Sequence, residues 1–364
     1  MTNNYNIIAC DGGGIRGLIT AMLLDDLVKN PPKNSTNTNI LGNVNLFAGT
    51  STGAIIAIGL ACNLQPSALV SLYSSKCGSI FLPYHPPSGS SSSALSRPGV
   101  PQLSLNPCSW IPDICYVEYT NSGVYNAVTS ALSGTTVDPK GPLSKVPTSV
   151  LAVTLMISDT SKDPWSPLAL SNLPNSDYAN MAVVDAAMCS SAAPLYFPPY
   201  AVPQPSGTGT MWCADGGVVA NNPSAFTLAN VLESQVLQQE QKDLSNVRML
   251  SLGTGATVDY IPSNLLDNLE NDWGMLNWLF PFSVPPEPKF PLQAAMFDGQ
   301  SQTADFITGN ILGAKQYQRA NPTLTGTINL DDCSQIGTLE TVAQDYIQSS
   351  DWINAKQWAY DNFV

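Results

Sequence analysis

Gly49-Thr50-Ser51-Thr52-Gly53 is the stretch that decides the fold of this 364-residue chain. The apolar run Val44 to Ala48 precedes it, and the apolar segment 54–61 follows it. Strand, G-x-S-x-G and helix in that order form a nucleophile elbow, a sharp turn that presents the serine hydroxyl above a sheet. Glycine permits the turn because it lacks a Cβ, and a helix starting at the serine favours developing negative charge. We therefore predict that Ser51 is a catalytic nucleophile, with a purely structural turn as the alternative.

A second glycine-rich stretch follows the first predicted strand, Tyr5–Cys10. It reads Asp11-Gly12-Gly13-Gly14-Ile15-Arg16-Gly17, and a helical pattern continues from it to residue 29. Consecutive glycines expose successive N–H groups, which suits the oxyanion of an acyl-transfer reaction or a phosphate. A dinucleotide site needs an acidic residue about 20 residues on, but that stretch is the loop 30–35. A P-loop needs Gly-Lys-Ser/Thr, which is absent, so the oxyanion interpretation is favoured over the nucleotide one.

A serine nucleophile needs a base, and the composition restricts the choice. The chain has one histidine, His85, in a loop rich in proline and serine. Enzymes with a Ser-His-Asp triad and an early elbow usually carry the histidine late in the chain, so a surface position is the expected one for His85. Asp215 ends an apolar run and is followed by Gly216 and Gly217. An Asp-Gly pair is often only a turn, yet without a well-placed histidine Asp215 is the favoured base.

At this point three separated motifs resemble the patatin-like phospholipase family, which includes plant patatins and calcium-independent phospholipases A2. They are the 11–17 loop, the Ser51 elbow and Asp215-Gly216-Gly217, in family order, together with the stretch 190–199. The resemblance covers roughly residues 5 to 255. It implies a Ser51–Asp215 dyad without histidine and an oxyanion hole from Gly12, Gly13 and Gly14. Arg16 matches the basic position of the family's loop.

Predicted strands alternate with predicted helices along the chain. The strands are 5–10, 44–48, 151–157 and 247–252; the helices are 17–29, 51–61, 67–75 and 223–238, with two further helices at 338–349 and 351–362. This alternation predicts an α/β fold with a mostly parallel central sheet, and the resemblance implies the three-layer α/β/α arrangement of patatins. We expect a catalytic domain over 1–255 and a C-terminal extension over 256–364 that packs on it.

Composition limits the partners of the chain. The formal net charge is −13 with only 14 lysines and arginines, which argues against nucleic acid and against electrostatic docking on anionic membranes. No long apolar span, secretory leader or metal-ligand motif such as H-E-x-x-H is evident. We expect no cofactor, no metal, no transmembrane segment and a cytoplasmic protein peripheral to membranes. Four of the eight cysteines lie in apolar runs and are expected to be reduced, whereas Cys108 and Cys115 share a loop and could bridge.

The segment 265–282 is unusually apolar towards its end. Trp273, Trp278 and Phe280 are the aromatic residues that would contact a substrate if this segment were a lid or an acyl-binding wall; the alternative is a helix packed on the core. The predicted function is a lipid acyl hydrolase of the phospholipase A type that cleaves phospholipid or galactolipid esters at a membrane or micelle surface. An acyltransferase using the same acyl-enzyme and a non-catalytic lipid-binding protein are the alternatives.

Overall fold

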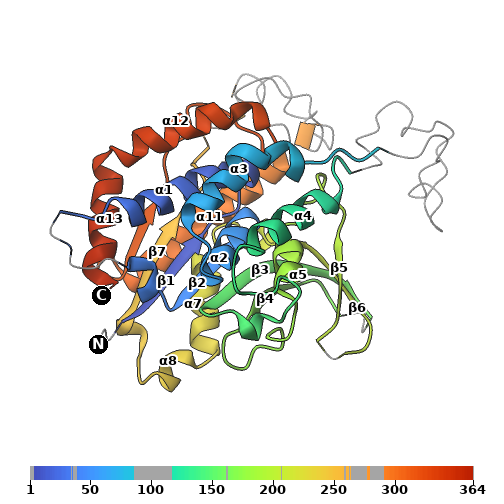
Figure 1. Ribbon diagram of the computed structural model, residues 1–364, viewed down its shortest axis with the longest axis horizontal. Coiled ribbons are helices and arrows are strands. Elements are labelled where there is room, and N and C mark those ends of the chain that lie inside the picture. Colours follow the sequence, from blue (N-terminus) through green and yellow to red (C-terminus); the bar gives the residue numbers. More distant parts are fainter. Residues whose placement is uncertain are drawn as a thin grey trace.

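An eight-stranded mixed sheet forms the centre of the protein in the computed structural model (Figure 1). The structure describes residues 4–33, 35, 39–85, 117–160, 163–205, 207–257, 260–261, 263, 277–278 and 291–363. The strand order is β5-β6-β3-β2-β1-β7-β8, and β4 pairs with β3. The strands are β1 (Tyr5–Cys10), β2 (Leu46–Thr50), β3 (Ser149–Asp159), β4 (Ser166–Ser171), β5 (Tyr200–Pro203), β6 (Thr210–Asp215), β7 (Val247–Leu252) and β8 (Tyr317–Ala320).

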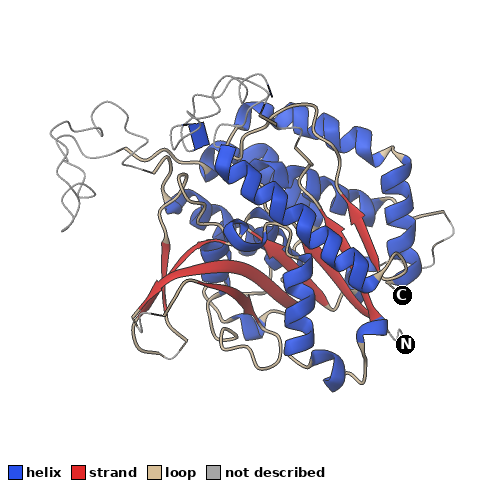
Figure 2. Ribbon diagram, turned by 180° about the vertical axis from the view of Figure 1, so that it is seen from behind, coloured by secondary structure: helices blue, strands red, loops and turns tan. Residues whose placement is uncertain are grey.

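Helices cover both faces of this sheet (Figure 2). They are α1 (Gly17–Lys29), α2 (Thr52–Ala61), α3 (Pro66–Ile80), α4 (Asn121–Leu132), α5 (Val183–Ser190), α6 (Gly217–Ala220), α7 (Ser224–Glu233), α8 (Val236–Gln239), α11 (Pro291–Leu312), α12 (Ile336–Ile347) and α13 (Ser350–Asn362). In a strand, alternate side chains point to opposite faces. Ile8 and Cys10 of β1 accordingly join a core with α1, α2 and α3, whereas Ile7 and Ala9 join a second core with α7 and α8. The predicted three-layer α/β/α fold is confirmed.

The parallel part of the sheet brings the two glycine-rich loops together. Strands β3, β2, β1, β7 and β8 run parallel, and Cys10 at the end of β1 is in register with Gly49 on one side and Leu252 on the other. Ligands of open parallel sheets bind beyond the carboxyl ends of the strands. The loop at Asp11, the elbow at Ser51 and the turn after Leu252 therefore share one edge.

The C-terminal third of the chain contributes to the same sheet. β8 pairs in parallel with β7, α11 packs against α7, and α12 packs against α1. The two ends of the chain meet where the Asn4 amide donates to the Asn362 carbonyl at 3.0 Å. Most of the predicted lid segment 265–282 lies outside the described residues. Among the helices that the structure describes, none is long and apolar enough to cross a bilayer.

One disulfide joins distant parts of the chain. Cys77 in α3 bonds to Cys333, 256 residues later, just before α12. The four cysteines expected to be reduced are buried free thiols, as predicted: Cys10, Cys62, Cys189 and Cys213. Cys108 and Cys115 lie outside the described residues, and the bond between Cys77 and Cys333 was not predicted from the sequence.

Candidate active site

Ser51 lies in a strained turn between β2 and α2. Its φ of 54° and ψ of −122° belong to a region that costs a non-glycine residue of order 1–3 kcal/mol. The two flanking glycines are sterically required. A Cβ on Gly49 would lie 2.1 Å from the Gly53 carbonyl oxygen, and a Cβ on Gly53 would lie 2.1 Å from the carbonyl oxygen of Cys10. The turn therefore has the geometry of a nucleophile elbow, packed against the end of β1.

A second serine fixes this strained backbone. The Ser51 N–H donates to the Ser190 hydroxyl at 2.9 Å, and that hydroxyl donates in turn to the carbonyl oxygen of Val153 at 2.5 Å. Ser190 ends α5, so this helix holds the elbow against β3. No role for Ser190 was predicted from the sequence, although the residue opens the family-like stretch 190–199.

The structure brings Ser51 and Asp215 together from positions 164 residues apart. The Ser51 hydroxyl donates to Asp215 Oδ2 at 2.6 Å. The other oxygen of the same carboxyl group, Oδ1, accepts the Gly217 N–H at 2.6 Å. Both carboxyl oxygens are therefore held, and Oδ2 is oriented to receive the Ser51 proton. General-base activation of a serine hydroxyl requires a hydrogen bond of this kind.

Burial adjusts the basicity of Asp215. The residue is 1% exposed, and its desolvation raises the pKa of the carboxyl group to about 7, against the lowering effect of the hydrogen bonds from Ser51 and Gly217. Burial disfavours the charged form of an acid. A carboxylate of ordinary pKa is a poor acceptor for a hydroxyl proton, whereas a pKa near the working pH suits a general base.

The loop 11–14 borders the Ser51 hydroxyl with two unused donors. Within the described part of the chain, the N–H groups of Gly13 and Gly14 donate to no backbone or side-chain acceptor, and both residues line the cavity that contains Ser51 and Asp215. The φ of Gly14 is +57°, and a Cβ there would lie 2.2 Å from the carbonyl oxygen of Leu330. This position therefore requires glycine.

Two residues expected in the oxyanion hole have other contacts. The Gly12 N–H donates to the carbonyl oxygen of Asn221 at 2.9 Å, so this donor is already used. The buried Arg16 side chain donates from Nε to the Gly13 carbonyl oxygen at 3.4 Å and lines a polar pocket apart from Ser51. Neither residue lines the cavity that contains Ser51 and Asp215. The expectation that Gly12, Gly13, Gly14 and Arg16 form an oxyanion hole stays a prediction, and Gly13 and Gly14 are the two of them that line the cavity.

An apolar cavity opens beside Ser51. Its empty volume is about 700 Å³, part of which is open to solvent. Side chains from α2, α3, α4 and α11 and from the 190–199 stretch form its walls, among them Ile55, Leu72, Val124, Phe197 and Phe297. Such a wall offers hydrocarbon contacts and few polar partners, so the cavity suits a fatty-acyl chain. The contribution of α4 and α11 to this wall was not predicted from the sequence.

The remaining predicted site residues lie elsewhere. His85 is exposed and does not line the Ser51 cavity. Trp273 and Phe280 lie outside the described residues, and Trp278 is half-buried without being among the cavity residues. In the part of the chain that the structure describes, no three histidine, cysteine or carboxylate side chains gather as a metal site would need.

The fold and the site together define a three-layer α/β protein with a serine elbow beside a buried acid. The particular family follows from comparison with known proteins: the family model of the patatin-like phospholipases matches residues 8–85 and 138–226 of the chain. The matched residues include the 11–14 loop, Ser51 and Asp215. The family resemblance seen in the sequence is confirmed.

Similar proteins occur in plants and bacteria. The chain is 25% identical to "Patatin-like protein 2" of Arabidopsis thaliana over 94% of this chain and 82% of that protein. It is 30% identical to a "cGAMP-activated phospholipase" of Pseudomonas aeruginosa over 70% of this chain and 64% of that protein, and 27% identical to its namesake in Vibrio cholerae over 73% and 68%. The family and these relatives support lipid hydrolase activity.

Proposed function

We propose that this protein is a phospholipase A-type lipid acyl hydrolase that uses Ser51 and Asp215 as a catalytic dyad. The observation that carries the proposal is the 2.6 Å hydrogen bond from the Ser51 hydroxyl to Asp215, at an apolar cavity. The substrates are fatty-acyl esters of phospholipids or galactolipids at a membrane or micelle surface. The acyl chain occupies the cavity, and the ester carbonyl lies against Gly13 and Gly14.

Each step moves one proton through Asp215. Ser51 Oγ attacks the ester carbonyl while its proton passes to Asp215 Oδ2. The oxyanion that forms receives the N–H groups of Gly13 and Gly14; one such donor is worth roughly 3–4 kcal/mol to the transition state. The carbon–oxygen bond to the leaving alcohol breaks, and Asp215 returns the proton to that alcohol. Water then repeats the sequence on the acyl-enzyme, releasing the fatty acid and restoring the Ser51 hydroxyl.

A panel of phospholipids and galactolipids tests the substrate class. Fatty-acid release is measured by mass spectrometry for the wild type, for Ser51→Ala and for Ser75→Ala, a matched serine change on the exposed part of α3. We expect release from at least one lipid class by the wild type and Ser75→Ala, and none above the protein-free rate with Ser51→Ala. Parallel reactions with a short alcohol separate hydrolysis from acyl transfer, which would yield the alcohol's ester. Release that survives Ser51→Ala would contradict the proposal.

The proposed reaction does not use a metal ion. Backbone N–H groups serve the oxyanion, so activity should persist in excess EDTA. A loss of activity that Ca²⁺ restores would contradict this assignment.

The redox state of Cys77 and Cys333, which form a disulfide in the structure, tests the cytoplasmic location expected from the sequence. Cytosolic thiols are kept reduced, so blocking free thiols in intact cells should label both residues if the protein is cytoplasmic, and neither if it occupies an oxidising compartment.

A further inference from the structure

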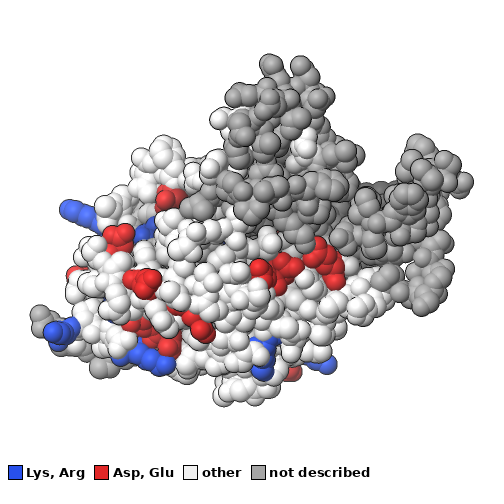
Figure 3. All heavy atoms as spheres, turned by 90° about the horizontal axis from the view of Figure 1, so that it is seen from above, with Lys and Arg blue, Asp and Glu red and all other residues white. Residues whose placement is uncertain are grey.

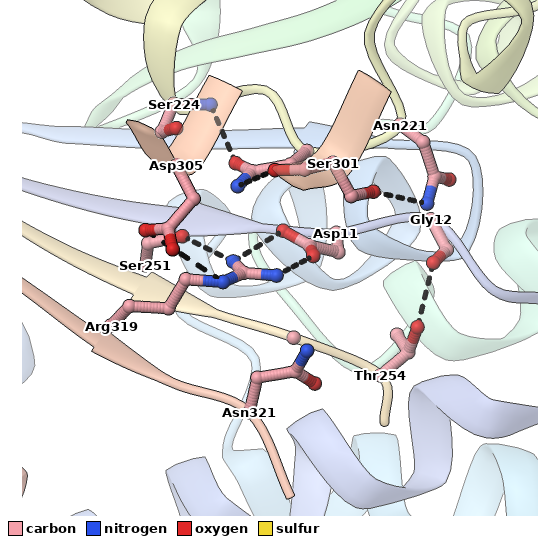
Figure 4. Close-up of polar contacts among 12 residues, drawn as sticks. Asp11, Gly12, Asn221, Ser224, Ser251, Thr254, Ser301, Asp305, Arg319 and Asn321 are labelled. Atoms are coloured by element: carbon pink, nitrogen blue, oxygen red, sulfur yellow. Dashed lines mark hydrogen bonds and ion pairs between the residues drawn. The ribbon is translucent and has the colours of Figure 1, made fainter. Parts of the chain in front are cut away.

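An ion pair anchors the first residue of the glycine loop. Arg319 reaches from β8 to Asp11, as Figure 4 shows, with its two terminal nitrogens 3.2 Å and 2.6 Å from the two carboxylate oxygens. The first of these nitrogens also donates to the Ser251 hydroxyl at 2.8 Å. Two parallel bonds between a guanidinium and a carboxylate fix direction as well as distance. Asp11 therefore has one defined position relative to β8.

Because the ion pair is buried, the charge of each partner depends on the other. The side chains of Asp11 and Arg319 are 4% and 14% exposed. Burial alone would lower the pKa of Arg319, but the Asp11 carboxylate outweighs it and keeps the guanidinium charged. Burial also raises the pKa of Asp11, against the lowering effect of Arg319. Removing one partner of a buried pair leaves the other uncompensated, so loss of Arg319 would favour a neutral and unanchored Asp11.

Further contacts from the same part of the chain hold the rest of the loop. The Thr254 hydroxyl donates to the Gly12 carbonyl oxygen at 2.7 Å, and the Ile15 N–H donates to the Leu330 carbonyl oxygen at 2.8 Å. Thr254, Arg319 and Leu330 all lie beyond residue 226, where the family-model match ends. The loop thus begins on β1, but its conformation depends on Thr254, Arg319 and Leu330.

We propose that Arg319 is a positioning residue, which holds the 11–14 loop through Asp11 so that the Gly13 and Gly14 N–H groups face the ester oxygen at Ser51. This inference rests on the proposed function and deepens it. Arg319 lines no part of the Ser51 cavity, so its effect on the reaction passes through the loop. It follows that the C-terminal third completes the oxyanion hole.

A polar pocket beside the ion pair makes the proposal testable by chemical rescue. The pocket has an empty volume of about 610 Å³, part of it open to solvent, and is lined by Asp11, Arg16, Thr254, Asp305 and Arg319, among others. Ser51 is not part of its wall. Truncating Arg319 would enlarge this pocket next to the Asp11 carboxylate. A free guanidinium ion could then enter and replace the missing group.

The experiment compares Arg319→Ala with Arg248→Ala, measuring ester hydrolysis per correctly folded molecule. Arg248 lies at the other end of the neighbouring strand β7, where it donates to Asn362 and to the Ser245 carbonyl oxygen. We expect kcat of Arg319→Ala to fall about 100-fold, the cost of a misplaced reacting geometry, with KM changed less than about threefold. Arg248→Ala should retain wild-type kcat. Arg319→Lys, which keeps the charge without the paired geometry, should be intermediate.

Guanidinium chloride at millimolar concentration, far below unfolding concentrations, should restore kcat of Arg319→Ala at least fivefold. Sodium chloride at equal ionic strength should not. The double variant Asp11→Asn, Arg319→Ala should show no rescue, because it lacks the carboxylate. A folded Arg319→Ala protein with wild-type kcat, or one whose loss guanidinium does not repair, would overturn the proposal. An inactive wild type would instead refute the proposed function, so the two failures are distinguishable.

Discussion

The carboxyl group of Asp215 shows how one buried residue couples stability to chemistry. Its pKa of about 7 in the folded protein exceeds the value of about 3.9 for an exposed aspartate. Between these two pH values the folded state therefore binds more protons than the unfolded state. Stability must fall as the pH rises through this window, so ionisation of the buried Asp215 carboxyl group lowers the stability of the folded protein.

A substitution at Asp215 should expose this cost. Asparagine keeps the shape of the side chain and an acceptor oxygen but does not titrate. Relative to the wild type, Asp215→Asn should gain stability between about pH 4 and pH 7, by at most about 1.4 kcal/mol per pH unit, and the gain should level off above pH 7. Denaturant unfolding of both proteins at pH 4.5, 6 and 8 measures it. A difference that is constant with pH would show that the folded pKa is not raised.

The lone histidine gives a second residue-scale prediction. His85 is exposed and lines no part of the Ser51 cavity. His85→Gln should therefore change kcat/KM less than about threefold, which corresponds to under 0.7 kcal/mol. Steady-state hydrolysis of a soluble ester is sufficient. A hundredfold loss would identify histidine as the base and remove Asp215 from that role.

Predictability at this scale depends on how local the signal is. Ser51 and Asp215 could be singled out because each stands beside glycines that the turn requires. Arg319 could not, because its partner Asp11 lies 308 residues away and nothing around it in Tyr317–Ala320 marks an ion pair. The hydrogen bond from the Gly12 N–H to the carbonyl oxygen of Asn221 could not be predicted either, because it forms only once the chain is folded.

At the scale of elements, buried parallel strands were the most predictable part. The bounds of β1 and β7 agree with the predicted strands, since both are short apolar runs between turns. The predicted helix 223–238 is two helices, α7 and α8, because Gln235 adopts a left-handed φ of 59°. Strands β4, β5 and β8 were missed. They lie at or near the edges of the sheet, contain proline or have only four residues, so periodicity gives little signal.

The disulfide gives the element-scale prediction. It ties α3, a wall of the apolar cavity, to the segment before α12 across 256 residues. Crosslinks that close long loops stabilise mainly by restricting the unfolded chain, so Cys333→Ser should lower the free energy of unfolding by about 2–4 kcal/mol. The activity of the folded variant at 25 °C should stay close to that of the wild type, because the Ser51–Asp215 contacts remain. Thermal unfolding of both proteins with and without a reductant measures this effect. The reductant should lower the unfolding temperature of the wild type and leave that of Cys333→Ser unchanged.

At the scale of the whole molecule, charge is sparse and negative. The net charge is −13, and Figure 3 shows a described face dominated by uncharged residues with scattered acidic and basic groups. We therefore expect the proposed contact with a membrane to be made by apolar side chains. The alternation of predicted strands and helices and the three motifs made the α/β/α architecture predictable. The contacts of the 11–14 loop and Ile15 with Thr254, Arg319 and Leu330 were not, because they depend on packing between segments far apart in sequence.

Vesicle composition tests this account of membrane contact. Hydrolysis of a phosphatidylcholine reporter lipid should be as fast in zwitterionic vesicles as in vesicles containing anionic lipid, or faster. On the anionic vesicles, raising the salt concentration should increase the rate, because screening weakens the repulsion of an acidic protein. Fatty-acid release from the reporter lipid and co-sedimentation of the protein with the vesicles are measured together. Activation by anionic lipid that salt abolishes would contradict apolar docking.

The most direct test of the central claim is the pH dependence of fluorophosphonate labelling, with the site of the adduct mapped by mass spectrometry. The wild type should be modified on Ser51 at a rate that rises with pH through one ionisation near 7, the pKa of buried Asp215. Asp215→Asn should label far more slowly and lose that ionisation, and Ser51→Ala should not label at all. An adduct on another residue, or an unchanged pH profile in Asp215→Asn, would contradict a Ser51–Asp215 dyad.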